Sequence, residues 1–439
     1  MNRRISSTRV LPRRSPRDAM VVAVSWGLFA LTAASDLRAE DSAAAPLHTL
    51  RNAFEAAWAR QPEAAALATR RVAVRAQQQS AQAWSSAPLT LEVSSKTDAL
   101  SRNQGAREIE MGVAVPLWLP GERGRSQTLA KAEGRALESR LAAAQLRVAA
   151  SVREAWWAWQ RASADADATR AQQGNAIRIA ADVSRRLKAG DLARADQHQA
   201  DGAVAAADGA VAQADANAMA AALHLRSLTA SPSSPNAAGF DHAGAQAEPE
   251  PEPAASAGGT STDTHAELAA LTDKLTVAEG SAALAATQSR ANPELTLAAT
   301  RGRGASGEAY SQTFTVGIRV PFGGGPRVEV RSATARGDAM ELQAQLVLER
   351  ARLSAEADAA RARTEGARVQ LAAAERRATL ARESRGFFDK SFRLGQTDLP
   401  TRLRIETEAA DAKRQTARAH IDLAAAISAW RQALGLLPQ

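Results

Sequence analysis

Side chains able to perform chemistry are spread along this chain of 439 residues without forming a recognisable catalytic group. The chain has no cysteine, which excludes disulfides, thiolate metal sites, cysteine nucleophiles and a lipidated N-terminal cysteine. Carboxylates are plentiful, but no pair or triad stands out by its spacing. The histidines show no metal-ligand spacing such as H-E-x-x-H; they are His48, His198, His224, His242, His265 and His420. The residues therefore predict no enzyme, no cofactor and no bound metal ion.

Two other groups of residues could suggest ligand binding. Residues 302–307 match the G-x-G-x-x-G pattern of dinucleotide-binding loops. Such a site needs the pattern between a strand and a helix, whereas here another strand pattern follows, so a flexible hairpin loop is favoured. Trp156, Trp157 and Trp159 cluster on a helical stretch, and adjacent residues cannot share one helix face. We therefore expect them to pack between helices.

The N-terminal segment accounts for most of the net charge. The formal charge of +8 would suggest nucleic-acid binding, but residues 1–39 hold seven arginines and two aspartates, or +5. A basic stretch followed by the apolar run 19–35 predicts a secretory signal peptide over 1–39, with a retained anchor as the alternative. We expect no nucleic-acid partner. Beyond residue 39 no apolar stretch approaches the length of a spanning helix, so insertion in a membrane would need strands.

The remaining chain repeats itself at an offset of 205 residues. Residues 110–116 (EMGVAVP) align with 315–321 (TVGIRVP), and the segment that starts at Leu187 aligns with the one that starts at Phe392. The repeat predicts two units, residues 40–230 and 265–439, each a helix, a strand pair, a long helix and a return helix. Between them, residues 231–264 are rich in Pro, Glu and Ser and predict a disordered linker.

Alternating residues predict two strand pairs, which include residues 89–94 and 109–115 in the first unit. One face of the strands carries Thr, Glu, Gly and Arg. The other face is apolar and consists of Leu89, Leu91, Val93, Ile109, Met111, Val113, Val115, Leu295, Leu297, Phe314, Val316, Ile318 and Val320.

Each strand pair leads into a long helical stretch. Glu122–Ala189 contains no proline and repeats apolar residues at steps of three and four, as a coiled-coil helix does. At about 1.5 Å per residue it would span roughly 100 Å. A second such stretch runs from Arg327 to Leu394, and return helices follow Gly190 and Gly395. The predicted fold is mainly α with β, with long coiled-coil helices between strands at one end and turns at the other.

Four strands cannot close a spanning barrel, which needs at least about eight. Three chains would supply twelve strands. We therefore predict a homotrimer whose strands form a 12-stranded transmembrane β-barrel in the outer membrane of a Gram-negative bacterium, above a helical tube in the periplasm. The apolar strand residues would face lipid, and the wet interior would act as a conduit.

Several of these segments resemble the TolC-type outer-membrane efflux proteins. The resemblance rests on the paired hairpins, on the Gly-rich breaks after Pro116 and Pro321, and on residues 392–399 (FRLGQTDL). Residues 116–124 (PLWLPGERG) and 189–194 (AGDLAR) are most similar to the cobalt-zinc-cadmium resistance (CzcC-like) branch. The chain departs from many relatives in lacking a lipidated cysteine and in its long Glu-Pro linker, so anchoring would rest on the barrel alone.

The resemblance implies a passive exit duct of a tripartite RND-type efflux pump, with a periplasmic adaptor (membrane fusion protein) and, indirectly, an inner-membrane transporter as partners. Heavy-metal cations, drugs and peptides all stay open as cargo. The resemblance places adaptor docking at the periplasmic tip, at Gly190, Asp191, Gly395, Gln396, Thr397 and Asp398. Charged residues near the turns are candidates for gate or docking contacts, with ordinary solvated or intrahelical ion pairs as the alternative. Besides Asp191 and Asp398 they are Arg185, Arg186, Asp196, Arg393 and Arg402.

Two other interpretations are weighed against the duct. A periplasmic adaptor also uses a long helical hairpin, but we expect it to carry one hairpin inserted in β-rich modules, whereas this chain has two hairpins and few strands. A soluble coiled-coil scaffold would account for the helices and for the 4% aromatic content. It would leave the duplicated strand pairs and the signal peptide unexplained.

Overall fold

The structure, a computed structural model, describes residues 49–101, 103–229, 249–254, 264–323 and 325–439. All of these described residues belong to one compact unit. The predicted signal peptide, 1–39, and most of the predicted linker lie outside the described residues. In the described ranges, no helix combines the length and the apolar character that a membrane crossing demands.

The helices agree closely with the sequence pattern. They are α1 (Leu50–Ala59), α2 (Pro62–Gln82), α3 (Glu122–Ala189), α4 (Arg194–Thr229), α6 (Ala266–Thr287), α7 (Gly325–Arg393) and α8 (Leu399–Ala433). The helical stretch before the first strand is broken between α1 and α2. Gln61 is extended there, with φ −69° and ψ 140°, because the proline ring that follows disfavours helical backbone at the preceding residue.

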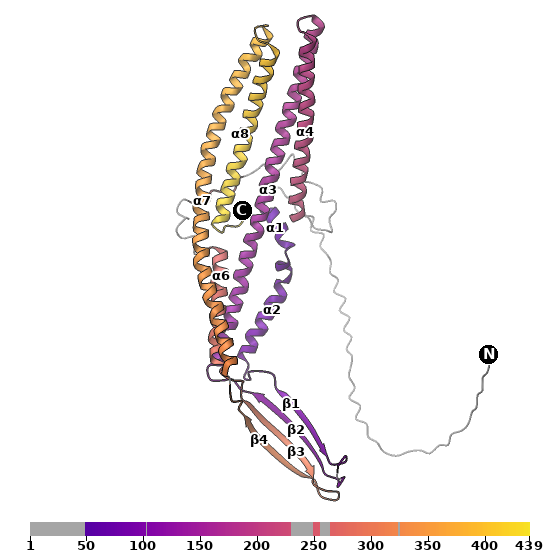
Figure 1. Ribbon diagram of the computed structural model, residues 1–439, viewed down its shortest axis with the longest axis vertical. Coiled ribbons are helices and arrows are strands. Elements are labelled where there is room, and N and C mark those ends of the chain that lie inside the picture. Colours follow the sequence, from indigo (N-terminus) through magenta and orange to yellow (C-terminus); the bar gives the residue numbers. More distant parts are fainter. Residues whose placement is uncertain (1–48, 102, 230–248, 255–263, 324) are drawn as a thin grey trace, which may run out of the picture. The chain divides into compact units, whose positions relative to one another are not determined.

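The two long helices each pair with their return helices. Figure 1 shows α3 beside α4 and α7 beside α8, and α6 contacts both α3 and α7. The partners of α3 therefore change along its length: α4 accompanies its later part and α6 its earlier part. Two shorter helices therefore cover different parts of one long helix.

One antiparallel sheet contains both strand pairs, of which one precedes α3 and the other precedes α7 in the chain. Its strands are β1 (Thr90–Thr97), β2 (Arg107–Pro116), β3 (Glu294–Arg303) and β4 (Ser311–Arg319), in the order β1-β2-β3-β4. The central pair joins strands from distant parts of the chain, with Val113 opposite Leu297. Val316 lies opposite Leu297 on the other side, so the predicted apolar residues line up across the strands.

Most of the predicted apolar face is exposed, but Val115 is not. Phe314 is 81% exposed and Met111 55%, whereas Val115 is only 6% exposed. Val115 lies at the end of β2 next to the loop that leads to α3, where Leu119 is also buried. The prediction that Val115 faces lipid is therefore wrong, since the chain itself covers it.

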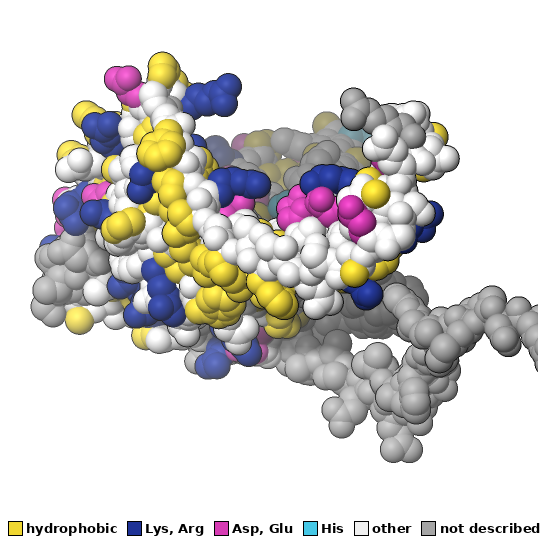
Figure 2. Space-filling view, turned by 90° about the horizontal axis from the view of Figure 1, so that it is seen from below, with side chains coloured by type: hydrophobic (Ala, Val, Ile, Leu, Met, Phe, Trp, Pro, Cys, Tyr) yellow, Lys and Arg dark blue, Asp and Glu magenta, His cyan; other side chains and the backbone are white. Residues whose placement is uncertain are grey.

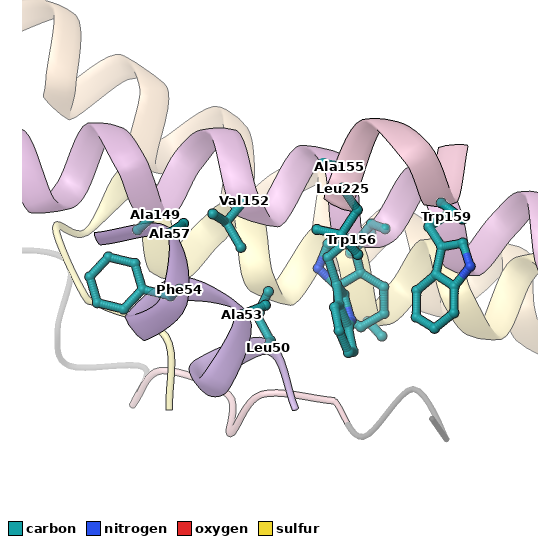
Figure 3. Packing of buried hydrophobic residues seen from close by; sticks show 14 of the residues in the cluster. Leu50, Ala53, Phe54, Ala57, Ala149, Val152, Ala155, Trp156, Trp159 and Leu225 are labelled. Atoms are coloured by element: carbon teal, nitrogen blue, oxygen red, sulfur yellow. The ribbon is translucent and has the colours of Figure 1, made fainter. Parts of the chain in front are cut away.

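The main core lies around the tryptophans of α3 (Figure 3). Trp156, Trp157 and Trp159 are all at most 3% exposed, and the rings of Trp156 and Trp159 meet edge to face with centroids 5.4 Å apart. Because α1, α4 and α8 all contact α3, more than one face of this helix is covered. The prediction that the tryptophans pack between helices is confirmed.

The predicted linker includes a described segment, residues 249–254, that packs on the helices. The Glu250 side chain is 2% exposed and lies 2.8 Å from Arg153 Nη2 and 3.2 Å from Arg431 Nε, and it accepts a hydrogen bond from Ser428 Oγ. Burial lowers the pKa of Arg431, which makes its carboxylate partner important. The prediction of disorder is wrong at these six residues, because Glu250 is the counter-ion of two buried arginines.

Candidate functional site

The two turns predicted as docking points have the same geometry. The α3–α4 turn and the α7–α8 turn contain Gly190 with φ 86° and Gly395 with φ 73°, a left-handed conformation that glycine adopts without strain. In each turn the amide after the glycine donates to the carbonyl five residues earlier, at 2.9 Å and 3.0 Å. This is the Schellman pattern, which ends a helix sharply and lets the chain return.

The turn residues leave polar groups free at the surface. Gly190, Asp191, Gly395, Gln396 and Asp398 are exposed. Thr397 is half-buried, and its Oγ1 lies 2.6 Å from Ser391 Oγ. Asp196 serves its own turn, since its carboxylate accepts the Ala193 amide at 3.0 Å, at the start of α4. The exposed residues can therefore contact a partner, whereas Asp196 has a capping role.

An apolar cluster lies below the turns and joins the two hairpins. Ile179 and Val183 of α3 pack with Phe392 of α7 and Leu399 of α8. Phe392 is 2% exposed, and its ring centroid lies 4.7 Å from Arg186 Cζ and 4.5 Å from Arg402 Cζ. Two cations over one buried ring are a favourable arrangement. The cluster therefore holds the hairpins together near their ends.

Arg402 bridges three helices beside this cluster. Arg402 belongs to α8, and its side chain is 11% exposed. It lies 3.3 Å from Asp182 of α3 and 2.9 Å from Asp389 of α7. A shielded arginine with two carboxylates is worth more than a surface pair, because screening by water is reduced. We call Asp182, Asp389 and Arg402 the tip triad.

The other predicted gate arginines surround the tip triad. Arg185 and Arg186 lie 3.2 Å and 3.6 Å from Asp182, and Arg393 lies 2.7 Å from Asp389. These contacts join residues three or four apart on one helix. The structure thus brings four of the predicted charges into a single network and leaves Asp196 outside it.

Sequence reasoning missed the acidic members of this network. Asp182 and Asp389 lie about two helical turns before the glycines, so the resemblance to known turns did not include them. Their spacing to Arg185, Arg186 and Arg393, three or four residues along a helix, was the available signal. The contact of Arg402 with Asp182 spans 220 residues of sequence and had no local signal.

A polar groove of about 720 Å³ continues from the tip triad between α3, α7 and α8. Glu406 in its wall is 9% exposed and accepts hydrogen bonds from Asn175 Nδ2 at 2.7 Å and Arg385 Nε at 3.0 Å. Seven arginines and three carboxylates line the groove, so its field is positive. Among the described residues there is no group of three or more His, Asp or Glu that could hold a metal ion.

Over the half of the sheet nearer the helices, one face is apolar, and charged side chains lie on the other face. Glu92, Glu110 and the ion pair of Lys96 with Glu108, at 2.9 Å, lie on the face opposite the apolar residues. Seen along the strands, the curved sheet has charged side chains in its hollow and apolar side chains on its outer side (Figure 2). One face is therefore suited to water and the other to an apolar surrounding.

No protein-family model matches the chain, and no curated protein matches it by sequence. Solved structures do match. The outer membrane protein VceC from Vibrio cholerae has a TM-score of 0.69 at 17% identity, with 88% of this chain and 96% of VceC covered. CusC, described for transmembrane channel formation, has a TM-score of 0.71 at 15% identity, with 88% and 92% covered. The MtrE outer membrane channel of Neisseria gonorrhoeae has a TM-score of 0.65 at 15% identity, with 88% and 89% covered.

These likenesses extend over nearly the whole length of each neighbour, so they include both the sheet and the long helices. The identities are low, and the similarity is one of architecture. This chain therefore has the fold of these outer-membrane and channel-forming proteins.

Proposed function

We propose that this chain is a TolC-type outer-membrane efflux protein, the passive exit duct of a tripartite RND-type pump, with its helices in the periplasm. The proposal rests on the apolar face of the sheet, which lies on the outer side of its curve (Figure 2) and which we call the outward face. Phe314, Val316 and Ile318 are 81%, 72% and 64% exposed, and Leu91 is 67% exposed. Such a continuous apolar surface is unfavourable in water, and lipid would cover it.

The edges of the sheet support a homotrimer. β1 and β4 are the outer strands in the order β1-β2-β3-β4, so each has one side without a strand partner in the described chain. Unpaired backbone groups cannot be left in lipid, and a closed barrel removes them. Three copies supply twelve strands, and the charged hollow side would then line a water-filled passage.

Membrane fractionation tests this proposal. The protein should stay in the outer-membrane fraction after carbonate washing and should migrate as a heat-labile trimer. An adaptor without a lipid anchor would leave the membrane, and a coiled-coil scaffold would be a water-soluble protein. Purification as a monomer that never inserts in lipid would refute the duct.

The turns support docking of a periplasmic adaptor, because the exposed residues of both turns lie at the same end of the two hairpins (Figure 1). The tip triad, which lies below the turns in Figure 1, supports a gate close to them. Asp191 and Asp398 are exposed, whereas Asp182 and Asp389 join separate helices through Arg402. We therefore propose that the tip triad, rather than the two turn aspartates, holds the gate closed.

Single-channel conductance in planar bilayers tests the gate. Asp182→Asn with Asp389→Asn should raise the conductance, because Arg402 of α8 loses both carboxylate partners, including Asp182, which joins it to the other hairpin. Asp191→Asn with Asp398→Asn removes the same charge from the exposed turns and is the matched control. Equal conductance of the two double variants would discard the tip triad as the gate.

The cargo class is a finer proposal within this function. The resemblance to the cobalt-zinc-cadmium branch favours heavy-metal cations, whereas the surplus of arginine in the groove favours neutral or anionic cargo. A strain without the gene, grown on zinc, cobalt, cadmium, copper and a panel of amphiphiles, distinguishes these. Sensitivity to the metals alone would support the cation class, and sensitivity to amphiphiles alone would exclude it.

A further inference from the structure

On the outward face of the sheet, the apolar rows end in arginines. The strand register places Arg301 opposite Ile109 and Arg303 opposite Arg107. Because side chains alternate along a strand, these residues share the face that carries Met111. The sequence pattern did not single out this group. We call Arg107, Arg301 and Arg303 the arginine rim.

An aromatic side chain organises the arginine rim. Tyr310 lies just before β4, and its ring centroid is 5.0 Å from Arg301 Cζ and 5.3 Å from Arg303 Cζ. Arg303 Nε also donates to the Gly105 carbonyl at 3.1 Å. Tyr310 remains 43% exposed, and Arg107 and Arg301 are exposed. The rim is thus a positioned cationic surface whose donors remain available.

In the described part of the chain, the nearby carboxylates form hydrogen bonds with loop amides and no ion pair with the arginine rim. Asp98, in the first hairpin loop, accepts the Gln104 amide at 2.7 Å. Glu308, in the second loop, accepts the amides of Gly304 and Ala305 at 3.0 Å and 3.1 Å. The residues that lie directly beside the rim arginines on neighbouring strands are uncharged. They are Ser95, Thr97, Ile109 and Gln312. The described residues therefore supply no anionic partner for the rim, and an anion from outside the chain would complete it.

The position of the rim along the strands selects the kind of anion. β2 has ten residues, which rise about 33 Å. At a tilt of about 40° this covers roughly 25 Å, the height of the apolar band of a membrane barrel. Arg107 begins β2 at the end remote from α3, so the rim lies at the boundary of that band rather than within it. Aromatic residues concentrate at the same boundary in membrane barrels.

We propose that the arginine rim binds the phosphate groups of the phosphorylated glycolipid in the outer leaflet, with the acyl chains along the apolar rows below. The inference rests on the proposed function, because the helices must be periplasmic for the rim to reach the outer leaflet. Guanidinium groups suit phosphate oxygens by charge and by their forked donors. Lipid is preferred to a soluble anion because the cationic and apolar surfaces are continuous.

Binding of bisphosphoryl lipid A to the purified full chain in detergent tests the proposal. The variant Arg107→Gln, Arg301→Gln, Arg303→Gln should bind at least about tenfold more weakly, as expected for the loss of three interfacial cations. Lysine at the same three positions should retain most of the affinity. Arg319→Gln is the matched control, since Arg319 is on β4 but on the charged face opposite Glu294, and it should bind as the unaltered chain does.

The proposal would be overturned if the unaltered chain did not bind the lipid, or if the glutamine variant bound it as tightly as the unaltered chain does. It would also be overturned if the unaltered chain bound a lipid A without phosphates equally tightly, or if inorganic phosphate at millimolar concentration displaced the lipid. If the glutamine variant fails to assemble, Arg301→Gln alone is compared with Arg301→Lys in the same titration. Fractionation of the unaltered chain reports separately on the duct. A chain that stays in the outer membrane but does not bind the lipid refutes the arginine rim and leaves the proposed function standing.

Discussion

Glu250 provides the sharpest test of the structure. Its carboxylate is 2% exposed between Arg153 and Arg431, whose side chains are each 5% exposed. Glu250→Gln removes the charge and leaves two buried cations next to each other. Breaking a buried ion pair from one side costs about 3–5 kcal/mol. This cost should favour release of residues 249–254, because water then reaches both arginines.

The expected effect is large enough to measure as a rate. A cost of about 3–5 kcal/mol raises the population of the released state by about 10² to 10³ or more. Since the chain has no cysteine, Ser428→Cys supplies a single thiol at a residue that is 0% exposed beneath Glu250. Its rate of labelling by a maleimide should follow the released population. We therefore expect labelling about a hundredfold faster when Glu250→Gln is added.

Glu252→Gln in the same background is the matched control. Glu252 lies two residues further along and pairs with Arg368, but the two side chains are 42% and 45% exposed. An exposed pair contributes little, so labelling should change by less than about fivefold. Similar rates for the Glu250 and Glu252 variants would refute the view that the buried pair holds the segment.

Three other substitutions test the turns, the sheet and the response to pH. Gly190→Ala places a side chain at positive φ and should lower the free energy of unfolding by about 1 kcal/mol, which a lower thermal midpoint would show. Gly209→Ala, inside α4, is the control and should not lower the midpoint. An unchanged midpoint for Gly190→Ala would contradict this prediction. Phe314→Glu should abolish the heat-labile trimer, whereas Thr315→Glu on the opposite face of the sheet should not. If both variants lost the trimer to the same extent, the proposal that only the face of Phe314 contacts lipid would be refuted. Burial lowers the pKa of His265, so the folded chain binds fewer protons than the unfolded chain and should lose stability as the pH falls below about 6.5. His265→Asn, which can still cap α6, should reduce that loss in thermal unfolding, and an equal loss would refute it.

The elements with strong local signals could be predicted. Glu122–Ala189 is one helix because it contains no proline and repeats small and apolar residues at helical spacing. Gly190 and Gly395 end helices because a left-handed residue there closes the Schellman pattern. The strands follow from alternation of apolar and polar residues.

Other features had no local signal. Glu250 resembled a solvated charge between prolines, but its partner Arg153 lies 97 residues away. Val115 has the same alternation as Val113, and only the adjacent loop buries it. The arginine rim needs the pairing of β2 with β3, which joins residues nearly 200 apart in the sequence. In each case a long-range neighbour decides whether a side chain is exposed, paired or covered.

The amino-acid sequence by itself determined the long helices, the two glycine turns and the alternation of the strands, because backbone preferences and side-chain periodicity act over a few residues. Only the tertiary structure decided that Asp182 and Asp389 meet at Arg402 and that Glu250 is buried. It also decided that three arginines lie together at one end of the central strands. Burial and ion pairing depend on which distant segments pack together, and that is set by the whole fold.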